Sequence, residues 1–311
     1  MNGYIHSFRT ISVLDSFSNG ILSDIYSGST IIQEPDYSKL IPATFLRRIS
    51  KVLKLGVSAA ISTSENKKLD GIIVASGQGC YSSSIDFINE YMNSITDSIS
   101  PTAFILSTNN TIAGHIALIL SCKEYNTTYV NKGMSFENAM IDAMILSAEK
   151  KEDILVGGVD EWVNIFELRK ETNVQFPEYW IGEGASFFIL NSKSKDALAV
   201  VKLCSMVSNV SSNIDEAIYN LLEINNLAKP DLILYGNSFV NEHSLRRDIL
   251  NIRTINYSEY CGIYFTNSAF GLQMGIEILN STSFTTSKTE AILVVNNFND
   301  CEFGLFYISK S

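Results

Sequence analysis

The sequence predicts an α/β fold, because apolar strands alternate with helical segments along most of its 311 residues. Continuous apolar runs such as GIIVAS (71–76) have the length and the branched residues of buried strands. The segment 44–62 instead repeats its apolar residues at helical spacing, with Arg and Lys between them. The elements expected in this first half are helices at 44–62, 83–95, 110–120 and 135–150 and strands at 71–76, 127–130, 153–159 and 185–191.

A second α/β half follows a polar, turn-like break at 193–197 (KSKDA). No low-complexity linker separates the halves, so we expect residues 1–194 and 195–311 to pack as one body. The elements expected in the second half are strands at 197–207, 231–236, 291–298 and 304–309 and helices at 213–225 and 271–280.

The composition is that of a well-packed globular protein, with 46% hydrophobic and 18% charged residues. A formal net charge of −10 argues against a nucleic-acid-binding surface, which needs clustered Lys and Arg, and it disfavours non-specific membrane adhesion. The start MNGYIHSFRT lacks the pattern of a signal peptide, and no stretch reaches the roughly 18 apolar residues of a membrane span. We therefore expect a cytoplasmic protein.

The five cysteines are widely spaced and form no CxxC pair, which argues against a zinc or redox site. We expect buried thiols and no metal or cofactor. The cysteines are Cys80, Cys122, Cys204, Cys261 and Cys301.

The helix expected at 110–120 carries apolar residues on more than one face, which predicts deep burial. His115 lies in this helix between apolar neighbours. Histidine is the commonest residue in general acid–base catalysis, but a hydrogen-bonded structural histidine is the favoured interpretation of such a position. His6 and His243 lie in polar surroundings and are expected at the surface.

The basic run LRRISKVLK stands out in an acidic protein. A charge run on an amphipathic helix is usually a solvated face. The alternative is a docking surface for an acidic partner, formed by Arg47, Arg48, Lys51 and Lys54.

Two tight turns each join a strand to a helix. Gly77 and Gly79 follow the strand at 71–76, but the third glycine and the acidic residue of a dinucleotide-binding motif are missing, so we interpret them as a close turn. The second turn, NKG at 131–133, precedes the helix at 135–150. Enzymes often mount a nucleophile on such a turn. This turn offers none, and the nearest hydroxyl belongs to Ser135.

Several motifs, taken together, resemble the β-ketoacyl synthases, which have the thiolase-like fold. The segment 101–130 is similar to the family's stretch before the active-site cysteine, including the AGH turn at 113–115. The pieces come in the family's order and cover most of the chain. The other similar segments are DILVGGVDE at 153–161, GEGASFFIL at 182–190, SAFGLQMGIE at 268–277 and the Asn-X-Phe strand end at 296–298.

The resemblance implies a five-layered α-β-α-β-α body made of two fused α/β halves. It also implies that 1–194 is an N-terminal β-ketoacyl synthase-like half and 195–311 a shortened C-terminal thiolase-like half.

The catalytic residues of that family do not carry over to this chain. Counting from the AGH turn and from the pair Asp142-Ala143 places the nucleophilic cysteine at Gly133, which cannot form a thioester. The family's two histidines and one lysine are absent as well. They correspond to one of Tyr235, Gly236 or Asn237, to Ser268, and to Ile263.

Claisen condensation needs a thiolate that holds the acyl chain and donors that stabilise the enolate. The resemblance therefore implies a chain-length-factor-like subunit without catalytic residues. Such a subunit pairs with an active β-ketoacyl-[acyl-carrier-protein] synthase in fatty acid or polyketide-type biosynthesis, and acts on chains bound to acyl carrier protein. The segments EPDY, LRRISKVLKLGVSAA and TTYVNKGMSFENA are similar to short synthase-like proteins of aryl polyene and flexirubin-type pigment clusters.

Two alternatives stay open at this stage. The first is an acyl hydrolase or decarboxylase that uses Ser135 or Ser268 with His115, although nothing in the sequence places a base within reach of either serine. The second is a structural homodimer without a synthase partner.

In the resembling family, the strand before the cysteine pairs across the dimer axis. This implies a subunit interface at Thr127, Thr128, Tyr129, Val130 and Asn131. We expect residue 133 to be a glycine because the turn requires positive φ, which glycine adopts without strain.

Overall fold

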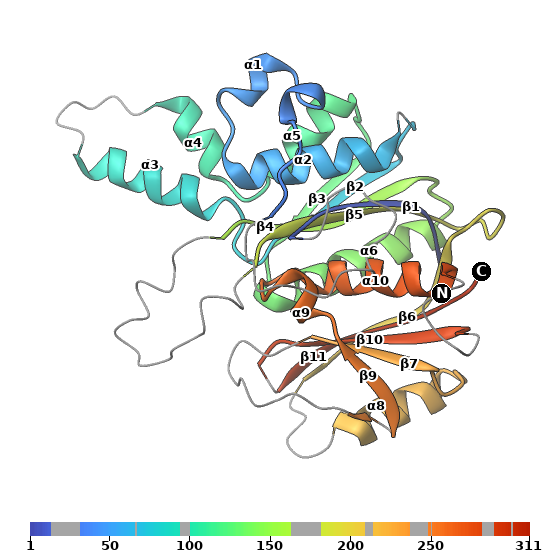
Figure 1. The fold of residues 1–311 in the computed structure, drawn as a ribbon. Helices are drawn as coiled ribbons and strands as arrows, with labels where there is room; N and C mark the ends of the chain where they lie inside the picture. Colours follow the sequence, from blue (N-terminus) through green and yellow to red (C-terminus); the bar gives the residue numbers. More distant parts are fainter. Residues whose placement is uncertain are drawn as a thin grey trace, which may run out of the picture.

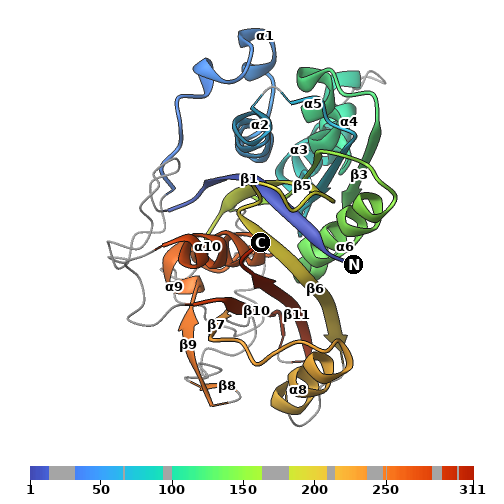
Figure 2. The same ribbon diagram turned by 90° about the vertical axis from the view of Figure 1, so that its right-hand side faces the viewer.

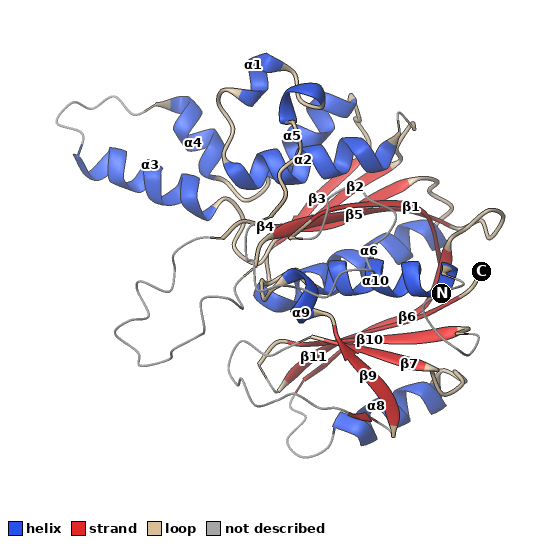
Figure 3. Ribbon diagram, in the orientation of Figure 1, coloured by secondary structure: helices blue, strands red, loops and turns tan. Residues whose placement is uncertain are grey.

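The computed structural model describes residues 1–13, 32–65, 67–93, 100–162, 182–208, 214–236, 248–249, 251–281, 289–299 and 301–311. The described elements form five layers, α-β-α-β-α, as Figure 1 and Figure 3 show. Outer helices cover one group of strands, two long helices follow beneath it, and a second group of strands and a last helix complete the stack. The predicted fold class is confirmed.

The first group of strands has the order β3-β2-β4-β5-β1. β2 lies parallel to β3 and β4, whereas β5 is antiparallel to both β4 and β1. β3 has no neighbour on its outer side among the described strands, so it forms an edge of the sheet. The bounds are β1 Gly3–Ile11, β2 Gly71–Ala75, β3 Tyr125–Tyr129, β4 Ile154–Asp160 and β5 Gly184–Asn191.

The second group has the order β6-β11-β10-β7-β9-β8 and joins the first through antiparallel pairing of β1 with β6. The division of the chain into halves at 194 and 195 falls in the connection between β5 and β6 and stays a prediction. The bounds are β6 Ala199–Ser208, β7 Leu232–Tyr235, β8 Asp248–Ile249, β9 Ile252–Asn256, β10 Ala291–Asn297 and β11 Glu302–Ser309.

The central layer consists of α6 (Ser135–Ala148) and α10 (Ser268–Asn280), which lie between the two groups of strands in both Figure 1 and Figure 2. Nearly every residue of α10 is buried, because both of its sides face a sheet. One apolar cluster unites this layer with both sheets and includes Phe136, Val156 and Val294. Burial of such side chains is the main source of folding free energy.

Helices form the outer layers: α2, α5 and α8 bury residues, whereas α1, α3 and α4 bury none. α8 covers the second group of strands, and the other outer helices lie over the first group (Figure 1). Their bounds are α1 Ala43–Leu46, α2 Lys51–Ser64, α3 Tyr81–Asn93, α4 Pro101–Ser107, α5 Thr111–Leu120 and α8 Ile214–Ile224; α9 is Ser258–Cys261, and single 3-10 turns span Tyr37–Lys39 and Lys132–Met134.

The prediction of one helix over 44–62 is wrong, because the chain breaks between α1 and α2. Ser50 is extended, with φ −68° and ψ 172°, and α2 begins after it. The carboxylate of Glu161 accepts a hydrogen bond of 3.0 Å from the backbone N–H of Val52. A carboxylate at this place satisfies a donor that the helix itself leaves free and complements the helix dipole, which favours a helix start here.

The prediction that helix 110–120 is deeply buried is also wrong. In α5 only Thr111, Ile112, Ala113 and Ile116 are buried, and Leu118 is 68% exposed. Only one face of α5 packs against the rest of the chain. Among the described residues, no single helix is long and apolar enough to cross a membrane; α4 and α5 would meet that test only together, and the chain bends by 102° between them.

Candidate functional site

The turn that holds the nucleophile position joins β3 to α6. Lys132 adopts the left-handed conformation with φ 48°, whereas Gly133 is not among the residues with positive φ. The expectation that Gly133 turns the chain is therefore wrong: Lys132 does so, although it carries a side chain.

Gly133 instead allows a close approach of Phe298, the aromatic residue of the Asn-X-Phe strand end. A Cβ added to the buried Gly133 would lie 2.2 Å from Cδ2 and 2.6 Å from Cγ of the Phe298 ring. Carbon atoms that are not bonded to each other require about 3.5 Å or more. The ring thus occupies the space in which the side chain of a nucleophile would begin.

The same arrangement recurs at the glycine turn after β2. A Cβ on Gly77 would lie 2.0 Å from Cβ of Phe265. The rings of Phe265 and Phe298 contact each other, with centroids 6.1 Å apart. The interpretation of this segment as a close strand-to-helix turn is confirmed, since α3 begins at Tyr81. Two neighbouring aromatic side chains, Phe265 and Phe298, therefore fill the space next to the glycines of the two strand-to-helix turns.

Asp160, at the end of β4, holds these turns in place. Its Oδ1 accepts from the Ser76 hydroxyl at 2.9 Å and from the Gly77 N–H at 2.8 Å. Its Oδ2 accepts from the N–H and hydroxyl of Thr266 at 2.9 and 2.8 Å. Burial raises the pKa of Asp160 to about 6, and these four hydrogen bonds oppose the shift. The carboxylate ties the β2 turn to the segment that carries Phe265.

Asn296, in β10, connects the nucleophile turn to a buried carboxyl group. Its Nδ2 donates to the carbonyl oxygen of Gly133 and to Oε1 of Glu137, each at 2.8 Å. An amide nitrogen carries two protons, so both bonds form at once. Burial raises the pKa of Glu137 to about 7, and the hydrogen bond from Asn296 opposes the shift. The site thus presents a carboxyl group that carries a proton over part of the neutral range.

The positions that match the family's histidines are filled by other side chains. A Cβ on Gly236 would lie 2.2 Å from the hydroxyl oxygen of Tyr257. The Tyr235 hydroxyl accepts from Nδ2 of Asn297 at 2.7 Å. Ser268 opens α10 and is fully buried, and Ile263 is buried too, while Asn237 lies outside the described residues. No imidazole stands at a described family position.

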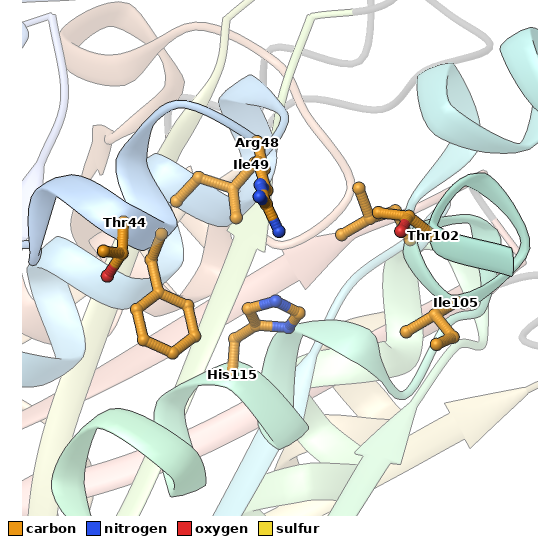
Figure 4. Close-up of a pocket in the computed structure, with 8 residues that line it drawn as sticks. Thr44, Arg48, Ile49, Thr102, Ile105 and His115 are labelled. Atoms are coloured by element: carbon orange, nitrogen blue, oxygen red, sulfur yellow. The ribbon is translucent and has the colours of Figure 1, made fainter. Parts of the chain in front are cut away.

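The geometry also argues against a serine enzyme that uses Ser135 with His115. The Ser135 hydroxyl accepts from the Asn131 N–H at 2.7 Å and lies within donating distance of the carbonyl oxygens of Ser76 and Lys132, at 2.9 and 2.7 Å. Its proton is thus directed to backbone oxygens rather than to a base. Nδ1 of His115 donates to Thr111 O at 2.9 Å, as expected for a structural histidine, and the ring lines a separate pocket (Figure 4).

The expected docking surface stays a prediction, although one of its residues, Lys51, already pairs with carboxylates of this chain. Its ammonium pairs with Glu183 and lies 3.5 Å from Glu34. Arg47 and Arg48 are exposed in the turn between α1 and α2, and Lys54 is half-buried.

The strand expected at the interface, β3, is the edge strand of the described sheet. Near its end, Tyr129 is half-buried and Val130 is 38% exposed. A contact at this edge stays a prediction.

The five cysteines are all unpaired thiols, but their predicted burial is only partly correct. Cys80 and Cys261 are buried, Cys122 and Cys204 are half-buried, and Cys301 is exposed in the turn between β10 and β11. Nε2 of His6 donates to Lys193 O at 2.9 Å, and His243 lies outside the described residues. Within the described part of the chain no group of three or more His, Cys, Asp or Glu side chains could hold a metal ion.

Comparisons with known proteins identify the fold. Residues 29–177 match the family model described as β-ketoacyl synthase, N-terminal domain. The chain has the fold of the β-ketoacyl synthases. The ishigamide ketosynthase/chain length factor covers the whole chain with a TM-score of 0.76 and 12% identity, over 99% of its own length. The resemblance to β-ketoacyl synthase-like proteins that the sequence motifs indicated is confirmed.

Two further structures share the β-ketoacyl synthase fold with this chain. One is a complex of a type II polyketide synthase acyl carrier protein with its ketosynthase, bound to the hexaketide. The matched chain of this complex has a TM-score of 0.79 and 16% identity, and the match covers 100% of this chain and 99% of that chain. The other is a ketosynthase in complex with its chain length factor from Xenorhabdus doucetiae, with TM-score 0.60, 14% identity and coverage of 98% and 99%. No curated protein matches the sequence.

Proposed function

We propose that this chain is a non-catalytic, chain-length-factor-like subunit. It pairs with an active β-ketoacyl synthase that extends chains bound to acyl carrier protein, in a polyketide or fatty acid-type pathway of the aryl polyene kind. The observation that carries the proposal is the ring of Phe298 in the space of a side chain at Gly133. A subunit that acylated itself would need a nucleophile at this turn.

The similar structures support the pairing, since one is a ketosynthase with its chain length factor and another holds an acyl carrier protein. The proposed partner is accordingly a synthase that keeps the cysteine and histidines this chain has replaced. In such a pair the synthase performs acyl transfer and condensation, and this chain forms one side of the interface between the two subunits.

β3, which has no outer neighbour among the described strands, supplies a surface for such pairing. Unpaired N–H and C=O groups of an edge strand can bond to a strand of another chain. We assign residues 127–131 to this contact. β-Branched and aromatic residues such as Thr128 and Tyr129 pack well on a pleated surface.

Exposed apolar side chains continue this surface onto α3, α4 and α5. α3 buries none of its residues, and Met92 is 74% exposed in this chain. Many exposed apolar side chains on neighbouring elements are typical of a protein interface. α5 contacts β3, and α4 joins α3 to α5. The exposed apolar residues on these helices are Ile85, Ile88, Tyr91, Met92, Phe104, Ile105 and Leu118.

Arg47 and Arg48 form the proposed docking point for the acidic carrier protein. Both are exposed, and neither forms an ion pair with a described carboxylate. Lys51 is already neutralised by Glu183 and Glu34 and contributes little to steering.

The proposal is tested by expressing the chain alone and together with the synthase genes that neighbour it. We expect co-purification of one synthase subunit, and condensation of malonyl and acyl carrier-protein substrates only by the pair. Condensation by the chain alone at an ordinary enzyme rate would refute the proposal. A stable homodimer that never takes up a synthase, seen by native mass measurement, would favour the structural homodimer instead.

A further inference from the structure

A pocket of about 320 Å³ lies between the α1–α2 connection and helices α4 and α5 (Figure 4). Four apolar side chains form most of its wall: Phe45, Ile49, Ile105 and Leu106. Its volume is at the small end of the range for ligand sites, about 300–1,000 Å³.

One side of this pocket carries a positive charge. The side chain of Arg48 extends over the pocket toward the ring of His115 (Figure 4). No carboxylate of the described residues pairs with Arg48, although Lys51, three residues later, has two. The guanidinium therefore keeps its paired N–H donors for a ligand, and these match the two oxygens of a carboxylate.

His115 is held in a fixed orientation in the same pocket. A carbonyl oxygen can only accept, so the 2.9 Å bond between Nδ1 and Thr111 O places a proton on Nδ1. Phe45 meets the imidazole edge-on, with ring centroids 6.1 Å apart and an interplanar angle of 84°. Nε2 is left for a second polar contact, and Thr44 and Thr102 line opposite sides of the pocket (Figure 4).

We propose that this pocket binds a small amphiphilic carboxylate. Its carboxylate lies on the guanidinium of Arg48, and its alkyl or aryl chain packs against Phe45, Ile49, Ile105 and Leu106. A single guanidinium matches one carboxylate, whereas a ligand with several phosphates would need more cationic groups. The site is separate from the closed turn at Gly133, and its test does not depend on pairing with a synthase, although it shares Arg48 with the proposed docking point for the carrier protein.

The test is calorimetric titration of the purified full-length chain with octanoate, which has ten non-hydrogen atoms. Acetate keeps the charge without the chain, and 1-octanol keeps the chain without the charge. We expect octanoate to bind at least tenfold more tightly than either. Equal binding of octanoate and 1-octanol, or no saturable binding of octanoate, overturns the proposal.

Variants locate the binding. Arg48→Gln should weaken octanoate binding at least tenfold, whereas Arg47→Gln, at the exposed neighbour that does not line the pocket, should leave it within twofold. Thr102→Phe fills the pocket from an exposed position and should also weaken binding. Equal effects of the two arginine variants would place octanoate elsewhere and refute the assignment.

The chain has three histidines, so their side-chain NMR signals are easily resolved. Octanoate should shift one of them, and that signal should be missing in His115→Gln. If octanoate shifts another histidine, or none, the pocket is not its site.

Discussion

Phe298 lies directly over Gly133, with its Cδ2 only 2.2 Å from where a Cβ of residue 133 would stand. Phe298 follows directly after β10, and Gly133 lies in the turn before α6, far away in the sequence. Nδ2 of Asn296, two residues before Phe298, donates to the carbonyl oxygen of Gly133 and fixes the distance between the segments. A nucleophile cannot return to this turn without displacement of the ring.

This contact predicts that any side chain at residue 133 destabilises the fold. Gly133→Ala and Gly133→Cys should each lower the free energy of unfolding by about 1–3 kcal/mol, the usual cost of overpacking a buried site. Gly133→Cys should also fail to condense substrate, because the histidine positions stay empty. Urea denaturation and a condensation assay measure the two effects.

A matched control is Gly114→Ala, in α5, where an added Cβ meets nothing within 4 Å. It should stabilise the chain by up to about 1 kcal/mol, since Ala is favoured over Gly within a helix. In the double variant Gly133→Cys/Phe298→Ala the two effects should not add, because removal of the ring relieves the clash. Strict additivity would show that the two residues do not compete for space.

Glu137 predicts a specific dependence of stability on pH. Its folded pKa is raised by burial from 4.5 to about 7, so the folded state prefers the protonated form. The stability that it contributes is complete below pH 4.5 and is lost as the pH rises through 7. Glu137→Gln has no ionisable group at this position, so the variant does not lose this stability as the pH rises. Relative to the original chain, the variant should become more stable from pH 5 to pH 8, by up to about 3 kcal/mol at about 1.4 kcal/mol per pKa unit.

Thermal or urea unfolding of both proteins at pH 5, 6, 7 and 8 measures this difference. Glu149→Gln, an exposed change near the end of the same helix, serves as control and should leave the pH profile unchanged. If the profiles of the Glu137 variant and the original chain stay parallel, the buried carboxyl group does not titrate as described.

The interface assigned to β3 predicts that a charge there prevents pairing. Val130→Asp should abolish co-purification of the synthase, because an unpaired carboxylate buried at an interface costs several kcal/mol, on the order of the stability of a weak dimer. Tyr129→Asp should act in the same way, although Tyr129 also packs on the core of this chain. Retained pairing and normal products with both variants would refute the assignment.

Ile224→Asp provides the control for this experiment. Ile224 is 75% exposed at the end of α8, on the opposite outer layer. The variant should pair as the original chain does. Loss of pairing in this variant as well would indicate a general loss of folded protein rather than a lost contact.

The exposed turn between α1 and α2 predicts electrostatic steering of the carrier protein. Arg47→Glu should slow association with the carrier protein by several-fold at low salt and reduce the salt dependence of the rate, because long-range attraction acts on encounter. Lys51→Glu should slow it less, since Lys51 is already paired. Surface plasmon resonance at two salt concentrations distinguishes them. Equal rates for the original chain and Arg47→Glu would leave the turn a solvated loop.

Much of the fold could be predicted from periodicity and apolar runs. Five elements lie within a few residues of the predicted ranges: β2, β4, β5, α6 and α10. These elements are largely buried, so their sequences are rich in apolar residues and could be recognised. β1, α4 and β9 were not predicted. β1 (GYIHSFRTI) mixes polar and apolar residues, and its place between β5 and β6 depends on strands almost 200 residues away.

The sequence places the candidate site but not its packing. Counting positions leads to Gly133, yet the reason for the glycine depends on Phe298, and a contact between residues so distant in sequence leaves no local pattern. The break at Ser50 was missed for a similar reason: the apolar spacing continues across it, and the carboxylate of Glu161 that favours a new helix start comes from another part of the chain.

The most direct test of the non-catalytic role is intact mass measurement of the co-purified pair after incubation with an acyl carrier protein that carries an activated acyl group. We expect an acyl adduct on the synthase subunit alone and an unchanged mass for this chain. An acyl adduct on this chain, at Ser135, Ser268 or any other residue, would contradict it.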